Sequence, residues 1–169
     1  MKVKDVMSER VRVCGFNTNL ATAAAIMWEG DCGMLPVITD DGTVEGIITD
    51  RDIAIAVGTR NQCANEIIAG EVMTGHVWGC KADDDIHTAL KLMRKEKVRR
   101  LPVVNDEAKL AGILSLNDVV THAKPADAHK PVDLTYDDVM KTFKAICEHC
   151  HAEDMELEQP TIASMTATT

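Results

Sequence analysis

Two hydroxyl–carboxylate pairs stand out in this chain because the same spacing occurs twice. Thr49 precedes Asp52 by three residues, and Ser115 precedes Asp118 in the same way. At the start of a helix, such a pair forms a capping box, in which each side chain accepts a hydrogen bond from the other residue's backbone N–H. A hydroxyl beside the free N–H groups of a helix terminus also offers a place for a phosphate. The pairs therefore allow a structural role, a ligand-binding role, or both.

The elements that carry these pairs are repeated as well. Residues 35–52 are echoed by residues 101–118, and the offset is constant. A fixed offset without a gap indicates one supersecondary unit used twice. The offset of 66 residues relates Met7 to Met73, Met27 to Met93, Pro36 to Pro102, Gly46 to Gly112 and Asp52 to Asp118.

Each unit predicts a strand, a helix, two strands and a second helix. Capping residues at 17–19 and 83–85 precede the first helix of each copy. The first helix then repeats its apolar residues at i, i+3, i+4 and i+7. These residues are Leu20, Ala23, Ala24 and Met27 in one copy, and Ile86, Ala89, Leu90 and Met93 in the other. Strands are expected at 11–14 and 77–80, and an Asp-Gly turn joins the runs 35–39 and 44–48.

Composition and charge exclude several classes of protein. The 169 residues are 46% hydrophobic and 27% charged, as in ordinary soluble domains. The net charge of −9 argues against a nucleic-acid binder, because cations that neutralise phosphate supply most non-specific affinity. No apolar run approaches the ~20 residues of a membrane helix. The N-terminus lacks a signal-peptide apolar region, so we expect a cytoplasmic location and reduced thiols for the six cysteines.

The repeated motifs resemble a known family. The order Val-Met-Ser/Thr, an Ala-x-x-x-Met helix, Leu-Pro-Val and Gly-x-x-Ser/Thr-x-x-Asp resembles the cystathionine-β-synthase (CBS) domain, and two copies look like the CBS pair, or Bateman module. The resemblance implies an α/β (α+β) fold of two βαββα repeats, packed sheet against sheet around a pseudo-two-fold axis with two clefts. The expected parts are repeat 1 (1–66), repeat 2 (67–123), a linker (124–134), a C-terminal amphipathic helix (135–152) and a tail (153–169) that we expect to be disordered.

The resemblance also implies a ligand. CBS clefts commonly hold adenosine derivatives, with the motif Asp on the ribose diol and the hydroxyl residue near the phosphates. By motif match these are Thr49 and Asp52 in one cleft, and Ser115 and Asp118 in the other. A carboxylate can accept from both ribose hydroxyls, and such charged hydrogen bonds contribute about 1.5–3 kcal/mol. Family members often carry Thr on the first strand, where this chain has Val13 and Gly79. The contacts with the adenine base would therefore depart from the family pattern.

Basic residues precede only the second Leu-Pro-Val. Lys97, Arg99 and Arg100 stand where the first copy has Asp31, Gly33 and Met34. They form either a phosphate site or a solvated basic face, and Arg51 beside Asp52 is a further candidate. In this family the basic residues of one copy often meet phosphates in the cleft of the other. We therefore expect the Thr49/Asp52 cleft to be the polyphosphate site.

The C-terminal segment predicts a separate helix. Residues 135–138 resemble a capping box, and an apolar stripe follows from Val139 to Cys150. We expect this helix to dock on a second chain and form a homodimer. Cys147, Cys150 and His151 fall at i, i+3 and i+4, which suits core thiols, a metal site completed by a partner, or a redox pair. The Cys-x-x-Cys-His form of haem attachment lacks a haem-sized apolar domain here.

These observations predict a stand-alone sensor. It would bind an adenosine-containing ligand (AMP, ADP, ATP, NAD or S-adenosylmethionine) and report occupancy to an unknown regulated partner. No nucleophile–base pair or catalytic cofactor motif is evident, so we do not expect an enzyme. The alternative is a metal- or redox-dependent interaction protein that acts through the C-terminal Cys/His helix.

Overall fold

Each repeat folds into a three-stranded sheet with two helices in the computed structural model, which describes residues 1–127 and 132–148. The first repeat contains β1 (Cys14–Gly15), α1 (Leu20–Glu29), β2 (Met34–Ile38), β3 (Val44–Thr49) and α2 (Asp50–Arg60). The second contains β4 (Cys80–Lys81), α3 (Ile86–Glu96), β5 (Arg100–Val104), β6 (Leu110–Ser115) and α4 (Leu116–His122). The predicted element order is confirmed in both.

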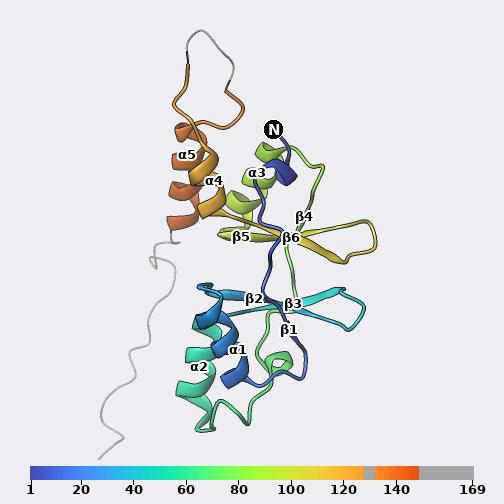
Figure 1. Cartoon of the computed structure of the whole chain (residues 1–169). Coiled ribbons are helices and arrows are strands. Elements are labelled where there is room, and N and C mark those ends of the chain that lie inside the picture. Colours follow the sequence, from blue (N-terminus) through green and yellow to red (C-terminus); the bar gives the residue numbers. More distant parts are fainter. Residues whose placement is uncertain (128–131, 149–169) are drawn as a thin grey trace, which may run out of the picture.

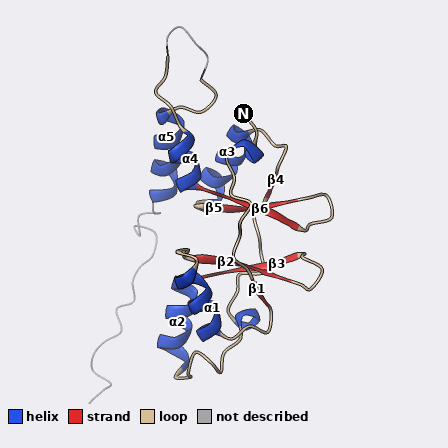
Figure 2. Ribbon diagram, in the orientation of Figure 1, coloured by secondary structure: helices blue, strands red, loops and turns tan. Residues whose placement is uncertain are grey.

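The two sheets share one topology. Their orders are β1-β2-β3 and β4-β5-β6, with the first pair parallel and the second antiparallel in each. Figures 1 and 2 show the sheets in the middle of the molecule and the helices on the outer faces. The turns after β2 and β5 exchange hydrogen bonds, from Val44 N to Ala108 O at 3.3 Å and from Leu110 N to Gly42 O at 3.0 Å. These reciprocal bonds fit the predicted pseudo-two-fold axis.

Most of the predicted helix starts are correct, whereas the first strands are shorter than expected. Asn19 caps α1 by accepting from Thr22 N, and Asp85 caps α3 by accepting from His87 N. Strands predicted at 11–14 and 77–80 are paired only from Cys14 and Cys80 onward. Each first strand lies at a sheet edge with one neighbour, so only the residues that pair with that neighbour are held in the sheet.

The segment that precedes each repeat, here called its lead-in, packs on the other repeat. The short 3-10 helices η1 (Val3–Asp5) and η2 (Ala69–Glu71) precede their own repeats in sequence. Val3 nevertheless donates to Asp84 O at 2.9 Å, and Ala69 donates to Thr18 O at 2.7 Å. Val3 belongs to the hydrophobic core of the second repeat, and Ala69 to that of the first. Each core is therefore completed by the segment that leads into the other repeat.

A fifth helix, α5 (Tyr136–Cys147), covers the second repeat. The Thr135/Asp138 capping box predicted for its start is present. We expected this helix to dock on a second chain, but it packs on α3 and α4 of its own chain, with Ile146 7% exposed. The predicted stripe is split, because Met140 is 63% exposed and only one side of α5 faces α3 and α4. The expected continuation from 149 to 152 and the expected tail at 153–169 lie outside the described residues.

No helix within residues 1–127 and 132–148 is long and apolar enough to cross a membrane.

Candidate functional site

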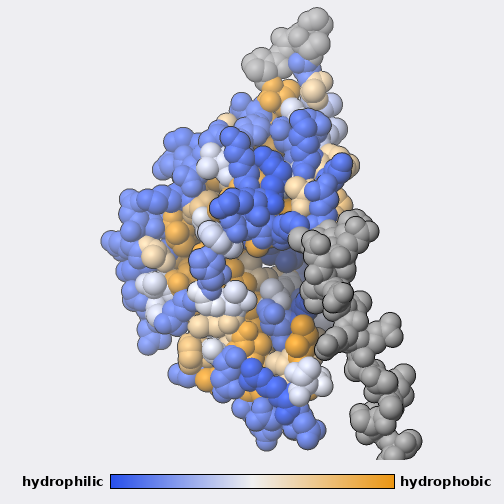
Figure 3. Space-filling model, turned by 180° about the vertical axis from the view of Figure 1, so that it is seen from behind, coloured by the Kyte–Doolittle hydropathy of each residue, from blue (hydrophilic) through white to orange (hydrophobic). Residues whose placement is uncertain are grey.

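A cavity of about 560 Å³ lies where the start of α2 meets the segment that leads into β5. Figure 3 shows a hollow at the level where the two repeats meet. The cavity joins five predicted site residues from both repeats with four that the sequence did not indicate. The predicted residues are Thr49, Arg51, Lys97, Arg99 and Arg100, and the others are Gly33, Asp50, Ile146 and Glu148.

The cavity is a local positive site in an acidic protein. Its lining contains four cationic side chains and two carboxylates, those of Asp50 and Glu148. The whole chain, in contrast, has a net charge of −9. Arg99 is exposed and Arg100 is half-buried, so both guanidinium groups belong to partly solvated side chains. A cationic cluster at the junction of two repeats attracts anionic ligands.

The end of α5 forms one rim of this cavity. Lys97 caps the C-terminus of α3 in the left-handed conformation, with φ of 53°. Its ammonium group donates to the backbone carbonyl of Glu148 at 2.7 Å. The repeat pattern could not place this contact, because α5 has no counterpart in the first repeat. The amphipathic pattern predicted the helix but not the surface that it covers.

Both hydroxyl–carboxylate pairs form capping boxes. The Thr49 hydroxyl donates to Asp52 Oδ2 at 2.7 Å and accepts from Asp52 N at 3.2 Å. The Ser115 hydroxyl makes the matching bonds with Asp118, at 2.5 and 3.1 Å. The structural role suggested by the sequence is thus confirmed for both pairs. Because both Thr49 donors use Oδ2 of Asp52, the capping box does not use Oδ1.

The free N–H groups that we expected at the start of α2 are already bonded. Asp50 N donates to Gly33 O at 3.3 Å, Arg51 N donates to Asp50 Oδ1 at 2.8 Å, and Asp52 N donates to Thr49. A phosphate that bound these N–H groups would have to replace those bonds, so the expected phosphate site at the start of α2 stays a prediction. The lysine and arginine side chains of the cavity offer phosphate ligands of opposite charge.

Asp52 does not line the central cavity with the five predicted site residues. It lines a different cavity of about 250 Å³, together with residues of α2 and of the segment that includes η2. In that cavity Arg60 donates to the carboxylate of Glu71 at 3.0 Å. Thr49 and Asp52 thus face different cavities, although they belong to one capping box.

Asp118 contacts the lead-in of the first repeat. Its Oδ1 accepts from the hydroxyl of Ser8 at 3.2 Å, while Oδ2 belongs to the capping box. This contact requires a close crossing at the glycine of the motif. A Cβ on Gly112 would lie 2.9 Å from Ser8 O, and one on Gly46 would lie 2.5 Å from Met73 Sδ. The motif glycines therefore let each exchanged lead-in pass over the strand beneath it.

Val13 and Gly79, the departures from the family pattern, are not among the residues that line the central cavity. Val13 is half-buried. Gly79 lies close to β5, and a Cβ there would come within 3.0 Å of Pro102 O. A larger side chain at position 79 would press on this backbone.

The cysteines do not assemble a metal site in the part of the chain that the structure describes. Cys14 and Cys80 are buried, and burial raises the pKa of their thiols to about 11 and about 12. Cys147 is exposed, whereas Cys150 and His151 lie outside the described residues. Within those residues, no three His, Cys, Asp or Glu side chains are grouped to hold a metal.

The CBS domain family model matches residues 3–58 and 69–124, which is more than half of the chain. The chain belongs to the CBS domain family. Among curated relatives of this CBS-domain protein, Hypoxic response protein 1 of Mycobacterium tuberculosis is 34% identical over 119 residues. That match covers 70% of this chain and 82% of the relative. The predicted tandem pair is therefore confirmed, and α5 lies outside it.

Solved structures support the same assignment. Hypoxic Response Protein I with two coordinated zinc ions gives a TM-score of 0.67 at 32% identity, covering 73% of this chain and 100% of that one. The CBS domain pair of protein MJ0100, in complex with 5′-methylthioadenosine and S-adenosyl-L-methionine, gives 0.65 at 27%, covering 72% and 94%. CBSX2 in complex with AMP gives 0.63 at 29%, covering 71% and 93%.

Proposed function

We propose that this CBS-domain protein is a regulatory module that binds an adenosine nucleotide between its repeats, with the phosphates on Arg99 and Arg100. The observation that carries the proposal is the cavity that brings these two residues of the second repeat to Thr49 and Arg51 of the first. Guanidinium groups form paired, charge-assisted hydrogen bonds with phosphate oxygens, which suits them to this role. Similarity to an AMP complex and to an S-adenosyl-L-methionine complex supports adenosine as the common part of the ligand.

The ribose would lie in the cavity that Asp52 lines, and the phosphates would extend past the Thr49/Asp52 capping box into the central cavity. In this proposal Oδ1 of Asp52 accepts from the ribose diol, while Oδ2 stays in the capping box. Asp118 would take the same role in the second cleft, where a ribose would compete with the hydroxyl of Ser8. The two clefts would then be unequal, because Lys97, Arg99 and Arg100 line the cavity on the Thr49 side.

Occupancy would be reported through α5. A ligand transmits a signal only if it binds two conformations with different affinities. Phosphates that bind Lys97 would weaken its bond to the Glu148 carbonyl, and this would favour release of the end of α5. The readout is a change in contacts with a regulated partner, rather than a chemical reaction. We further propose that the protein works in the cytoplasm as a homodimer.

A metal-dependent interaction protein is the second candidate. The similarity to Hypoxic Response Protein I with two coordinated zinc ions favours it. In this case Cys147 would supply an exposed ligand near the end of α5, and Cys150 and His151 would follow it in sequence.

The ligand that copurifies with the full chain distinguishes the nucleotide-binding module from the metal-dependent interaction protein. We expect native mass spectrometry to detect an adenosine-containing molecule, and calorimetry to give saturable binding of AMP, ATP, NAD or S-adenosylmethionine. Elemental analysis of the same sample measures zinc. Stoichiometric zinc without binding of any of these four ligands would contradict the proposal and support the second candidate.

A further inference from the structure

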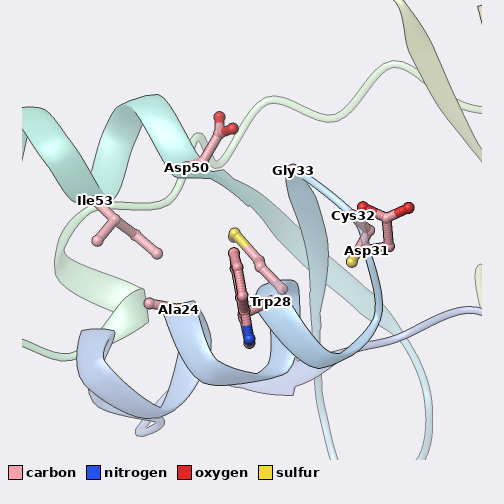
Figure 4. Close-up of a pocket in the computed structure, with 8 residues that line it drawn as sticks. Ala24, Trp28, Asp31, Cys32, Gly33, Asp50 and Ile53 are labelled. Atoms are coloured by element: carbon pink, nitrogen blue, oxygen red, sulfur yellow. The ribbon is translucent and has the colours of Figure 1, made fainter.

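The positive charge of the central cavity is concentrated on the second repeat. Three cationic side chains line that side, namely Lys97, Arg99 and Arg100. On the side of the first repeat, the cation of Arg51 is accompanied by the carboxylate of Asp50. Figure 4 shows Asp50 and Asp31 on either side of Gly33, and a Cβ on Gly33 would lie 2.9 Å from Oδ2 of Asp50. An anion in the cavity is therefore drawn toward the second repeat.

The two arginines on this side have no carboxylate partner among the described residues. Within residues 1–127 and 132–148, Arg60 forms an ion pair with Glu71 at 3.0 Å, whereas Arg99 and Arg100 form none. Arg99 is exposed and Arg100 is half-buried, so an incoming group can reach both. A carboxylate accepts two parallel hydrogen bonds from one guanidinium group, just as a phosphate does. The cavity is therefore suited to carboxylates as well as to phosphates.

The chain leaves α5 at the rim of this cavity. Glu148 lines the cavity, and its carbonyl accepts from Lys97 at 2.7 Å. Residues 149–169 contain no lysine or arginine, and their four carboxylates fall within six positions. These acids are Glu153, Asp154, Glu156 and Glu158. The first stands five positions after Glu148, and five residues span at most about 18 Å. The same chain thus carries an acidic segment within reach of the cavity.

We propose that residues 153–158 occupy the cationic side of the central cavity when no phosphate is bound there. Their carboxylates would pair with Arg99 and Arg100. A short tether keeps such a segment at an effective concentration of about a millimolar, so individually weak ion pairs suffice. The inference takes its regulatory meaning from the proposed function, whereas the contact itself does not require a nucleotide.

The segment and the phosphates of a ligand would then compete for the same two guanidinium groups. Such competition is reciprocal, because the factor by which the segment weakens phosphate binding is also the factor by which phosphate weakens segment binding. Adenosine carries no phosphate, so its affinity would not depend on the segment. A bound phosphate would release residues 153–158 near the end of α5, where a regulated partner could bind them. The acidic segment is thus an internal competitor that sets the threshold for a phosphorylated ligand.

Carbodiimide cross-linking of the full chain tests the contact without a nucleotide. The reagent joins an amine to a carboxylate that lies against it, and Lys97 supplies an amine in the cavity. We expect mass spectrometry to find Lys97 joined to residues 153–158, with a yield that falls at least about fivefold in about 1 M NaCl, where the Debye length is about 3 Å. Lys109, in the turn between β5 and β6, should not be joined to this segment. No link to Lys97, or links only between two chains, would overturn the proposal.

Neutral side chains in the segment should raise the affinity for a phosphorylated ligand. The variant is Glu153→Gln/Asp154→Asn/Glu156→Gln/Glu158→Gln in the full chain. Calorimetry should show at least about a tenfold gain in affinity for ATP and less than about a twofold change for adenosine. The control removes four exposed carboxylates that do not line the central cavity, in the variant Glu9→Gln/Asp40→Asn/Glu45→Gln/Glu107→Gln. It should leave both affinities within about twofold, because solvent screens distant charges. Equal gains in ATP affinity in the two variants would overturn the proposal.

The two measurements separate this inference from the proposed function. If neither ATP nor adenosine binds, the proposed nucleotide site fails, whereas the cross-link to Lys97 still decides whether the segment occupies the cavity. If ATP binds equally to the wild type and to the variant with the neutral segment, the inference alone fails.

Discussion

The hydroxyl of Ser8 donates a hydrogen bond to the carboxylate of Asp118 at 3.2 Å, across 110 positions of sequence. This bond exists because the first lead-in crosses the second repeat at Gly112. Backbone of the two segments pairs there, with Ser8 N donating to Ile113 O at 2.9 Å and Ile113 N donating to Ser8 O at 2.9 Å. Each repeat thus depends on the other for part of its core and for one side of its cleft.

Gly112→Ala tests this crossing. The added Cβ would lie 2.9 Å from Ser8 O, a backbone atom held by the bridge, so the lead-in must shift. We expect a loss of about 1–3 kcal/mol in the free energy of unfolding, measured with urea. Gly58→Ala is the control, because its Cβ meets open space within α2. It should stabilise by about 0.5–1 kcal/mol. Equal effects of the two variants would argue against a tight crossing.

Ile146→Ala tests the docking of α5 on its own repeat. Ile146 is 7% exposed within the core of the second repeat, so its truncation should cost about 2–5 kcal/mol of unfolding free energy. Met140 on the same helix is 63% exposed, and Met140→Ala should change stability by less than about 0.5 kcal/mol. Denaturation across a range of protein concentrations measures both. A concentration-dependent loss confined to Ile146→Ala would instead place α5 between chains.

The buried thiols predict a loss of stability in alkali. Burial raises the pKa values of Cys14 and Cys80 from an ordinary 9.0 to about 11 and about 12. The folded state therefore keeps both protons while the unfolded chain releases them, so their contribution is complete below pH 9 and is lost as the pH rises toward 11 and 12. Cys14→Ala/Cys80→Ala should lose less stability than the wild type between pH 9 and 11. An identical slope would contradict these pKa shifts.

Asp52→Ala separates capping from ligand binding. Loss of the capping box should cost about 0.5–2 kcal/mol of stability, and loss of the ribose contact should weaken nucleotide binding about ten- to a hundredfold. Asn19→Ala is the matched control, since it removes the side-chain cap of α1, and Asn19 lines neither the central cavity nor the cavity of Asp52. It should cost similar stability and leave nucleotide affinity unchanged. Calorimetry with AMP measures the affinity. Unchanged affinity in folded Asp52→Ala would remove Asp52 from the site.

Local patterns in the sequence predicted most of the fold. The duplicated motifs indicated both sheets, and Asn19, Asp85 and Thr135 marked true helix starts because capping is decided within one turn. The exchange of the lead-ins was not predictable in this way. Val3 and Ala69 occupy equivalent places in both repeats, so sequence alone does not say which core each one joins.

The candidate site was predicted less completely than the fold. The family resemblance predicted that Lys97, Arg99 and Arg100 reach the cleft of the first repeat, and these residues do line one cavity with Thr49. Asp52 was expected beside them but faces another cavity. Side-chain direction at the start of a helix changes by about 100° per residue, so membership of one motif does not bring two side chains into one cavity. Glu148 was missed because its contact with Lys97 depends on where α5 docks.

The most direct test of a nucleotide between the repeats compares ATP with adenosine in the variant Arg99→Ala/Arg100→Ala. If the two guanidinium groups bind phosphate, calorimetry should show at least about a tenfold loss of ATP affinity, while adenosine affinity changes by less than about twofold. Lys91→Ala/Lys95→Ala removes equal charge from exposed positions on α3 and should leave both affinities unchanged. Equal losses for ATP and adenosine, or equal losses in the two double variants, would contradict the assignment of the phosphates to Arg99 and Arg100.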